Sequence, residues 1–384
     1  MKARRTWDIF CSVVDNFGDI GVCWRLARQL TSERGQSVRL WVNDLASFHR
    51  LCRRVDPARE LQIVDAVEVR HWGVPFPQVA PADIVIEGFG VRLPDAYVEA
   101  MAARSPHPVW INLEYLSAES WVDGCHGLPS PHPGLPLVKH FFFPGFTFAT
   151  GGLLRESGLT EARDAFQSDP AAMTAFWRSL DLPQGGALRV SLFCYGNAAL
   201  PALVEAWSSD RLPVVCIVPE GKALTQLSQI AGQRIEPGSR IELGSLSVAA
   251  IPFLDLDQYD RLLWACDVNF VRGEDSFVRA QFAARPLVWQ AYPQDEGAHL
   301  NKSAAFLARY ASALGTAAGP VYCAFAEAWN RESADVGKYW AELRCHRDAL
   351  AAHARNWAGN LAAGGSLAIK LAEFCEDRLK YPVF

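Results

Sequence analysis

The chain has 384 residues, of which 50% are hydrophobic and 21% charged, with a formal net charge of −5. This length exceeds what one hydrophobic core usually supports, so two domains are expected, and the composition excludes a disordered chain. The absence of a Lys/Arg-dense segment argues against nucleic acid as a partner. No apolar run approaches the length of a membrane span and no signal peptide precedes the first strand. We therefore expect a cytoplasmic protein without membrane contact.

The sequence opens with a strand, a turn and a helix. An apolar run at 7–14 leads into the turn 15–19 (Asp-Asn-Phe-Gly-Asp), and apolar residues then recur at helical spacing over 22–30. This pattern predicts the first unit of a doubly wound α/β domain, in which ligands bind beyond the carboxyl ends of the strands. Such turns usually bind phosphate through backbone N–H groups, but Asp15 and Asp19 would repel a phosphate. The turn is therefore predicted to hold a cationic group or to accept a proton.

Two further series of strands follow in chain order. The first series is predicted at 38–42, 61–64, 82–87 and 108–113. A helix capped by Asp169, with Pro170 in its first turn, ends at the glycine-rich stretch 182–186. The second series is predicted at 187–197, 212–218, 248–253, 268–271 and 287–289.

The tail of the chain is predicted to be helical. A helical pattern covers 333–363, breaks at Gly364-Gly365 and restarts with Ser366 as an N-cap. We expect a Rossmann-like N-terminal domain at 1–155, a helical linker at 156–186 and a Rossmann-like C-terminal domain at 187–363. The last helix, 366–384, is expected to pack back on the first domain.

A second informative motif follows the strand predicted at 268–271. It reads Arg-Gly-Glu-Asp-Ser over 272–276 and leads into a helix, whose free N–H groups favour anions. An arginine forks onto phosphate oxygens, and the two carboxylates can accept hydrogen bonds from sugar hydroxyls. This combination suits a nucleotide-sugar diphosphate. The alternative is structural: Ser276 acts as an N-cap while Glu274 and Asp275 complement the helix dipole.

Other motifs are less specific. Asp255-Leu256-Asp257 matches the D-x-D pattern of metal-dependent glycosyltransferases, but Asp257 is better explained as an N-cap with Asp260 three residues later. The first turn lacks the G-x-G-x-x-G of a dinucleotide-binding enzyme. It also lacks the D-x-D of haloacid-type phosphatases. Among the tryptophans, Trp121 and Trp289 are the candidates for contact with a sugar.

Four blocks of sequence together resemble the bacterial protein-arginine rhamnosyltransferases that modify translation elongation factor P, the EarP family. The blocks are 15–22 (DNFGDIGV), 112–117 (NLEYLS), 142–146 (FFPGF) and 272–281 (RGEDSFVRAQ). The resemblance runs nearly end to end. It implies a GT-B fold with two Rossmann-like domains facing a central cleft, and an inverting transfer from dTDP-β-L-rhamnose to an arginine in the N-terminal domain of the factor.

The resemblance also implies roles for individual residues. Asp19 would be the catalytic carboxylate and Asp15 its partner. The donor would be bound by Asn16, Phe17, Gly18, Tyr195, Phe253, Arg272, Gly273, Glu274, Asp275 and Ser276. One departure stands out: the family is expected to read Pro-Phe-Leu-Pro-Gln where 252–256 reads Pro-Phe-Leu-Asp-Leu, so a side-chain amide near the nucleotide is missing.

The chemistry of the residues agrees with such a transfer. An arginine guanidinium is delocalised and a poor nucleophile, so attack on an anomeric carbon requires one nitrogen to be held and deprotonated. Asp15, Asp19 and Glu114 are predicted to bind the acceptor, with Asp19 accepting its proton. Arg272 and the adjacent helix N-terminus are predicted to stabilise the leaving diphosphate without a metal. A GT-B enzyme with a small-molecule acceptor and a non-catalytic nucleotide-sugar-binding protein remain the alternatives.

Overall fold

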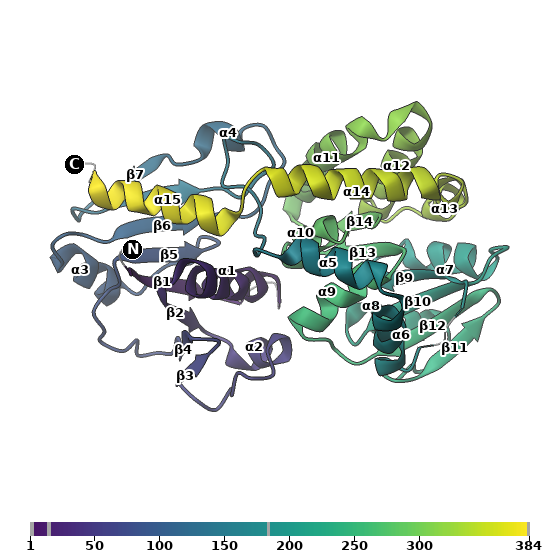
Figure 1. The fold of residues 1–384 in the computed structure, drawn as a ribbon, viewed down its shortest axis with the longest axis horizontal. Coiled ribbons are helices and arrows are strands. Elements are labelled where there is room, and N and C mark those ends of the chain that lie inside the picture. Colours follow the sequence, from purple (N-terminus) through teal and green to yellow (C-terminus); the bar gives the residue numbers. More distant parts are fainter. Residues whose placement is uncertain (1–3, 14–16, 183–184, 382–384) are drawn as a thin grey trace. The chain divides into compact units, whose positions relative to one another are not determined.

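The protein is described by a computed structural model that covers residues 4–13, 17–182 and 185–381. The chain forms two compact units (Figure 1). One unit runs to Ser157 and resumes at Leu361, and the other spans Gly158–Asn360. No helix within the described ranges is long and apolar enough to cross a bilayer.

The first unit is built on an eight-stranded sheet in the order β3-β4-β2-β1-β5-β6-β8-β7. The six central strands are parallel, and the edge strands β3 and β7 pair antiparallel. Its strands are β1 Thr6–Cys11, β2 Ser37–Val42, β3 Leu61–Val64, β4 Val67–His71, β5 Ile84–Gly88, β6 Val109–Leu113, β7 Pro129–Pro131 and β8 Val138–Phe142. Its helices are α1 Gly18–Arg34, α2 Leu45–Leu51, α3 Asp95–Ala103, α4 Val122–Cys125 and α15 Leu367–Lys380.

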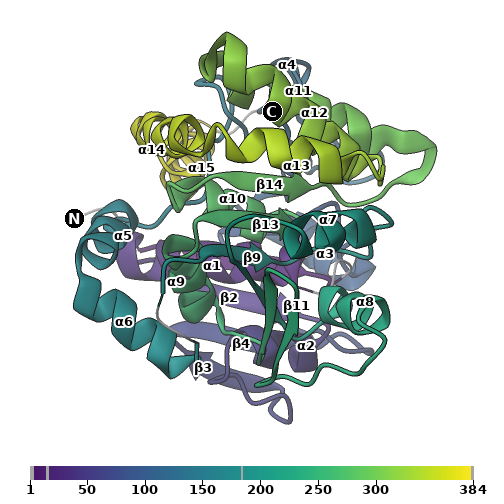
Figure 2. The same ribbon diagram turned by 90° about the vertical axis from the view of Figure 1, so that its right-hand side faces the viewer.

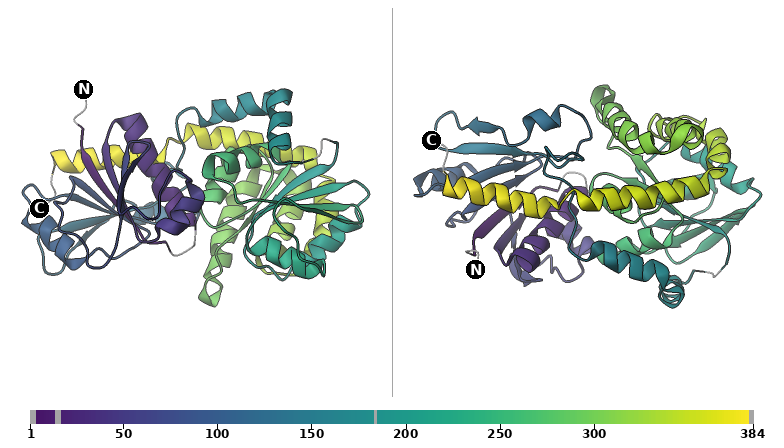
Figure 3. Two further views of the ribbon diagram at one scale, coloured as in Figure 1. Left: turned by 90° about the horizontal axis from the view of Figure 1, so that it is seen from below. Right: turned by 45° about the horizontal axis from the view of Figure 1, so that its top comes forward.

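The last helix, α15, completes the first unit. It packs beside α1 and β6, and it is the yellow helix along this sheet in Figure 3. Ser366 occupies its N-cap position as predicted, but the hydroxyl donates to the carbonyl of Arg155 at 2.9 Å and makes no capping bond. Gln29 of α1 donates to the same carbonyl at 2.6 Å and to the Ser366 hydroxyl at 3.1 Å. Three distant parts of the chain are thus joined at one point.

The second unit is built on a six-stranded sheet in the order β11-β12-β10-β9-β13-β14, parallel except for β11. In Figure 2, α9 and α10 lie next to each other at β13. Its strands are β9 Leu188–Leu192, β10 Val214–Pro219, β11 Arg240–Leu243, β12 Leu246–Ile251, β13 Val268–Arg272 and β14 Leu287–Gln290. The helices from here to the C-terminal helix are α5 Leu159–Ser168, α6 Pro170–Ser179, α7 Leu200–Ser208, α8 Lys222–Ile230, α9 Leu256–Ala265, α10 Asp275–Phe282, α11 Ala298–Tyr310, α12 Gly315–Asn330, α13 Val336–Arg344 and α14 Arg347–Ala363.

Helices α5 and α6 precede this sheet in the chain and pack within the second unit. Asp169 caps α6 as predicted: its carboxylate accepts from the N–H groups of Ala171 and Ala172 at 2.8 and 3.2 Å, with Pro170 at the first position. Arg163 of α5 donates to the carbonyl of Phe282 at 2.7 Å. Helix α5 therefore contacts the C-terminal end of α10.

The prediction that Asp257 caps a helix is wrong by two residues. Helix α9 begins at Leu256, and the N-cap is Asp255, whose carboxylate accepts from the N–H of Gln258 at 2.8 Å. Asp257 lies in the first turn, where a negative charge still favours the helix dipole. Both aspartates lie at the start of the helix, before most of its apolar residues, so the sequence pattern did not show which of them is the N-cap.

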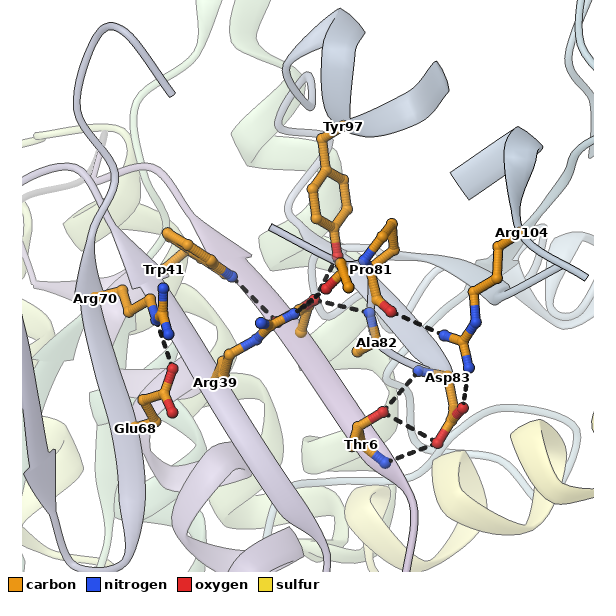
Figure 4. Close-up of polar contacts among 12 residues, drawn as sticks. Thr6, Arg39, Trp41, Glu68, Arg70, Pro81, Ala82, Asp83, Tyr97 and Arg104 are labelled. Atoms are coloured by element: carbon orange, nitrogen blue, oxygen red, sulfur yellow. Dashed lines mark hydrogen bonds and ion pairs between the residues drawn. The ribbon is translucent and has the colours of Figure 1, made fainter. Parts of the chain in front are cut away.

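A buried carboxylate joins the strands of the first unit near their amino ends. Asp8 of β1 is fully buried and accepts from Arg39 Nε at 2.6 Å, from Trp41 Nε1 at 3.1 Å and from the N–H of Ala82 at 3.0 Å. The hydroxyl of Tyr97, on α3, also donates to it. Figure 4 shows Arg39 and Trp41 of β2 converging with Tyr97 of α3.

The energetics of this cluster follow from its burial. Burial would lower the pKa of Arg39, but the hydrogen bonds and charge of Asp8 raise it above its ordinary value. Arg39 Nη2 also donates to the carbonyl of Ala80 at 2.8 Å. Removing one partner of such a pair leaves the other charge buried without compensation, which costs more than the pair itself contributes.

We expect Asp8→Asn to lower the free energy of unfolding of the first unit by about 3 kcal/mol, because it leaves the Arg39 guanidinium uncompensated. The control is Asp95→Asn, which breaks an exposed pair with Arg92 whose side chains are 77% and 86% accessible. That change is expected to cost less than about 0.5 kcal/mol. Urea unfolding followed by tryptophan fluorescence measures both, and equal effects would contradict the proposed role of Asp8.

Candidate functional site

The candidate acceptor side lies at the carboxyl edge of the first unit's sheet. Asp19 sits in the first turn of α1, and only 2% of it is exposed. The hydroxyl of Tyr115, which follows β6, donates to Asp19 Oδ1 at 3.3 Å. Asp15 and Asn16 fall outside the described residues. A carboxylate buried among the apolar residues of a helix start is costly, so its retention there favours a chemical role.

An aromatic pair lies beside this carboxylate. The rings of Phe89 and Tyr115 stack at 4.6 Å with an interplanar angle of 22°. Phe89 follows β5 and has a left-handed φ of 61°, which is unusual for a bulky side chain. Such strained positions are concentrated at functional sites. The strain here directs an aromatic ring toward the residue that contacts Asp19.

Glu114 is held by the strand that precedes it. Asn112 Nδ2 donates to Glu114 Oε1 at 2.6 Å, while Asn112 Oδ1 accepts from the N–H of Gly90 at 3.1 Å. Because Glu114 and Tyr115 are adjacent after β6, the same loop carries both a carboxylate and the hydroxyl bound to Asp19. The structure therefore brings Asp19 and the Glu114 loop to one edge, as the sequence predicted for parallel strands.

Phe17 and Gly18 begin α1 and are half-buried. The carbonyl of Phe17 accepts from the N–H of Gly21 at 3.0 Å, which starts the helix. The guanidinium of Arg50 lies 5.6 Å from the centre of the Phe17 ring. Both predicted donor-binding residues therefore belong to the first unit, on the same turn as Asp19.

The candidate donor side lies at the carboxyl edge of the second unit's sheet and centres on Arg272. This residue ends β13 and is 8% exposed, with its guanidinium carbon 4.5 Å from the ring centres of both Phe193 and Tyr195. Its Nη1 is buried and has no hydrogen-bond partner in the described part of the chain. A buried cationic donor without an acceptor is costly, and a bound anion would relieve that cost.

The turn after Arg272 is rigid. Gly273 has a φ of 61° and its carbonyl accepts from Trp289 Nε1 at 2.8 Å, while the Trp289 ring stacks on Phe277 at 4.0 Å. Ser276 is not the N-cap: that position is Glu274, and the Ser276 hydroxyl donates to the carbonyl of Arg272. The N-terminus of α10 therefore lies directly after the cationic side chain.

The remaining predicted donor residues share this edge. Tyr195 follows β9 and is 5% exposed, its N–H donates to Gln290 Oε1 at 2.8 Å, and its ring meets Tyr292 edge-on at 5.3 Å. Phe253 follows β12 and is more exposed. Since β10 lies between β12 and β9, Phe253 is two strands away from Tyr195 on the same edge.

A second buried arginine has a structural role and provides a comparison for Arg272. Arg279 of α10 donates to both oxygens of Asp260 on α9, at 3.0 and 2.6 Å, and both side chains are buried. This pair fixes α10 against α9 and so orients the N-terminus of α10. Arg272, seven residues earlier, has no comparable ion pair with the described residues.

The structure adds residues that the sequence analysis had not assigned to the site: Phe89, Asn112, Tyr115, Phe193, Gln290 and Tyr292. The sequence could have indicated these residues only by their position, because each is close to the carboxyl end of a buried strand. Their contacts join residues far apart in the chain, such as Asp19 and Tyr115, so spacing does not show them. Within the described ranges, no group of three or more His, Cys, Asp and Glu side chains is arranged to hold a metal ion.

Comparison with known proteins identifies the family. Residues 7–376 match the model of EarP, the elongation factor P (EF-P) rhamnosyltransferases. A protein-arginine rhamnosyltransferase of Pseudomonas putida is 50% identical over 381 residues, which cover 99% of this chain and 100% of the relative. One from Pseudomonas aeruginosa is 46% identical over 376 residues, which cover 97% and 100%.

Solved structures agree with this assignment. A structure determined for EarP-mediated arginine glycosylation of EF-P superimposes with a TM-score of 0.70 at 36% identity, covering 97% of this chain and 99% of the other. MurG of Acinetobacter baumannii matches at a TM-score of 0.50 and 12% identity, covering 98% and 100%, and this likeness concerns the fold alone. The fold is GT-B, and the chain belongs to the EarP family of glycosyltransferases, the EF-P rhamnosyltransferases.

Proposed function

We propose that this chain transfers L-rhamnose from dTDP-β-L-rhamnose to an arginine side chain of translation elongation factor P, with inversion at the anomeric carbon. The observation that carries the proposal is the buried Asp19 carboxylate at the carboxyl edge of the first sheet. The chain that holds it is 50% identical in sequence to a protein-arginine rhamnosyltransferase. The EF-P acceptor is supported by the family that the chain matches and by a related structure that concerns EarP-mediated arginine glycosylation of EF-P.

On the acceptor side, carboxylates hold and activate the guanidinium. Glu114, held by Asn112, and Asp15 would pair with its nitrogens and localise its charge, while Asp19 accepts the proton as the C–N bond forms. The Tyr115 hydroxyl keeps the Asp19 carboxylate in one orientation by donating to one of its oxygens.

On the donor side, Arg272 and the N-terminus of α10 stabilise the leaving diphosphate. The unpaired Nη1 supplies a charge-assisted hydrogen bond, and the first N–H groups of α10 supply further donors. Glu274 and Asp275 accept from sugar hydroxyls. A nucleotide-sugar donor is also in keeping with a neighbour of the same fold, HepE of Anabaena, which was solved in complex with UDP-glucose.

Phe253 is the better candidate to stack on the thymine. The ring of Tyr195 already packs against Arg272 and Tyr292, and almost none of it is accessible. Tyr195 therefore acts by holding the guanidinium of Arg272. Base stacking on an aromatic ring contributes about 1–3 kcal/mol, and Phe253 is only partly buried.

The transfer is tested by the intact mass of purified EF-P after incubation with the protein and dTDP-L-rhamnose, with and without EDTA. We expect a gain of one deoxyhexose on an arginine, unchanged by EDTA because Arg272 and α10 replace a metal. Donor binding without this gain would favour a small-molecule acceptor or a non-catalytic binding protein. A gain that EDTA abolishes and Mg²⁺ restores would contradict the metal-free donor site.

Asp19→Asn is expected to lower kcat by about 10²–10⁴, the range for loss of a positioned base, with little change in donor affinity. Asn keeps the size and the hydrogen bond to Tyr115 but cannot accept the proton. Asp95→Asn, an exposed carboxylate of the same unit, is the matched control and should retain full activity. Turnover of Asp19→Asn near that of the wild type would refute the catalytic role.

Arg272→Lys is expected to weaken dTDP binding by about 10- to 100-fold, because an ammonium keeps the charge but loses the planar fork between two rings. Arg240→Lys, on the edge strand β11 with half of its side chain exposed, serves as the control. Isothermal titration calorimetry measures both. Equal affinities for the two variants would remove Arg272 from the donor site.

A further inference from the structure

The second unit contains a cavity that the transfer reaction does not use. Its volume is about 430 Å³, within the range of small-molecule sites. It is lined by the amino ends of β9, β13 and β14 and by residues of α12, α13 and α14. Arg272 lies at the opposite end of β13 from Val268, which lines the cavity. At about 3.3 Å per residue, that strand separates the cavity from the donor edge by about 13 Å.

The lining combines an apolar wall with an excess of positive charge. The apolar wall includes Leu188, Val288, Tyr322, Trp340 and Leu350. The charged lining residues are Arg189, Arg285, Arg344 and Arg347, against Asp267 and Asp348. The cavity wall therefore carries two more positive than negative side chains.

Three of these arginines are already engaged in other contacts. Arg344 forms an ion pair with Asp210. Arg347 lies 3.4 Å from Asp348 in an exposed pair, and such pairs contribute little. The guanidinium of Arg189 packs on the ring of Trp177 at 4.6 Å.

Arg285 is different. It is half-buried, and its Nε donates to the carbonyl of Trp264, near the end of α9, at 3.2 Å. Within the described ranges, no hydrogen bond or ion pair engages its two Nη groups, although the nearby charge of Asp267 favours the cation. Burial, the main effect, lowers the pKa of Arg285. A cation that is partly desolvated, and whose two Nη groups bind no described residue, is favourable for binding an anion.

We propose that this cavity binds a small amphipathic acid, with a carboxylate, sulfonate or phosphate group on Arg285 and an apolar body against Tyr322 and Trp340. The apolar wall excludes a small inorganic anion as the best match, because such an ion leaves most of the cavity unfilled. The excess positive charge disfavours a neutral apolar molecule of the same size. The site is independent of the proposed donor and acceptor residues.

The test compares two dyes of nearly the same shape. 8-Anilino-1-naphthalenesulfonate carries an acidic group, and N-phenyl-1-naphthylamine is its neutral counterpart. We expect the wild-type protein to bind the sulfonate at least about tenfold more tightly, and Arg285→Gln to abolish that difference, as loss of a charge-assisted hydrogen bond predicts. Fluorescence titration measures all four affinities.

Two further variants locate the bound dye within the cavity. Arg347→Gln removes the same charge from the exposed rim and should change the sulfonate affinity less than about threefold. Ala351→Trp, which fills the cavity, should weaken both dyes while leaving rhamnosyl transfer intact. The proposal is overturned if both dyes bind the wild type equally, if neither binds, or if Arg347→Gln weakens the sulfonate as much as Arg285→Gln does.

Discussion

A buried parallel strand leaves no room in its middle for an unpaired polar side chain, and this constraint organises both sheets. Each strand places its reactive residues just beyond its carboxyl end, where the chain leaves the sheet. Asp19, Glu114 and Tyr115 in the first unit follow this rule, as do Tyr195 and Arg272 in the second. A charged side chain buried inside a strand needs partners, and Asp8 has them: five donors from Arg39, Trp41, Ala82 and Tyr97 surround it.

Three arginines with little exposure differ in how their guanidinium groups are paired. Arg279 uses both of its forked donors on Asp260 and fixes α10. Arg39 does the same on Asp8 and holds β2 to β1. Arg272 is held by ring faces instead, and its buried Nη1 has no hydrogen-bond partner among the described residues. An arginine held in this way is preorganised for a ligand anion, since binding requires no ion pair to be broken first.

Much of the architecture could be predicted from the sequence because its strands are continuous apolar runs bounded by turn residues. The strands near 38–42, 61–64 and 268–271 were predicted within a residue or two of β2, β3 and β13. The strands β4, β7, β8 and β11 were not predicted. In β8 the apolar pattern is interrupted by Lys139 and His140, and Lys139 is paired with the buried Glu87 at 2.8 Å. Hydropathy does not reveal such a tertiary ion pair.

The candidate site was predicted less completely, for a similar reason. Motif blocks marked Asp19 and Arg272, but the partners that hold them, Tyr115 and Phe193, come from other strands. Tyr195 was predicted as one of the donor-binding residues, and its packing against Arg272 and Tyr292 could not be read from the sequence. Side-chain type indicates which chemistry is possible, and only packing shows which face of a ring is still available.

The return of α15 to the first unit has a consequence for synthesis. Gln29, Arg155 and Ser366 meet at one point, so the first unit lacks a helix until α15 has left the ribosome. Translation of the intervening second unit takes on the order of tens of seconds. During that interval the surface that binds α15 stays uncovered, including Phe142 and His126, which contact Phe374 in the folded protein. A nascent chain would expose an apolar face suited to chaperone binding, and α15 would complete the first unit once it is made.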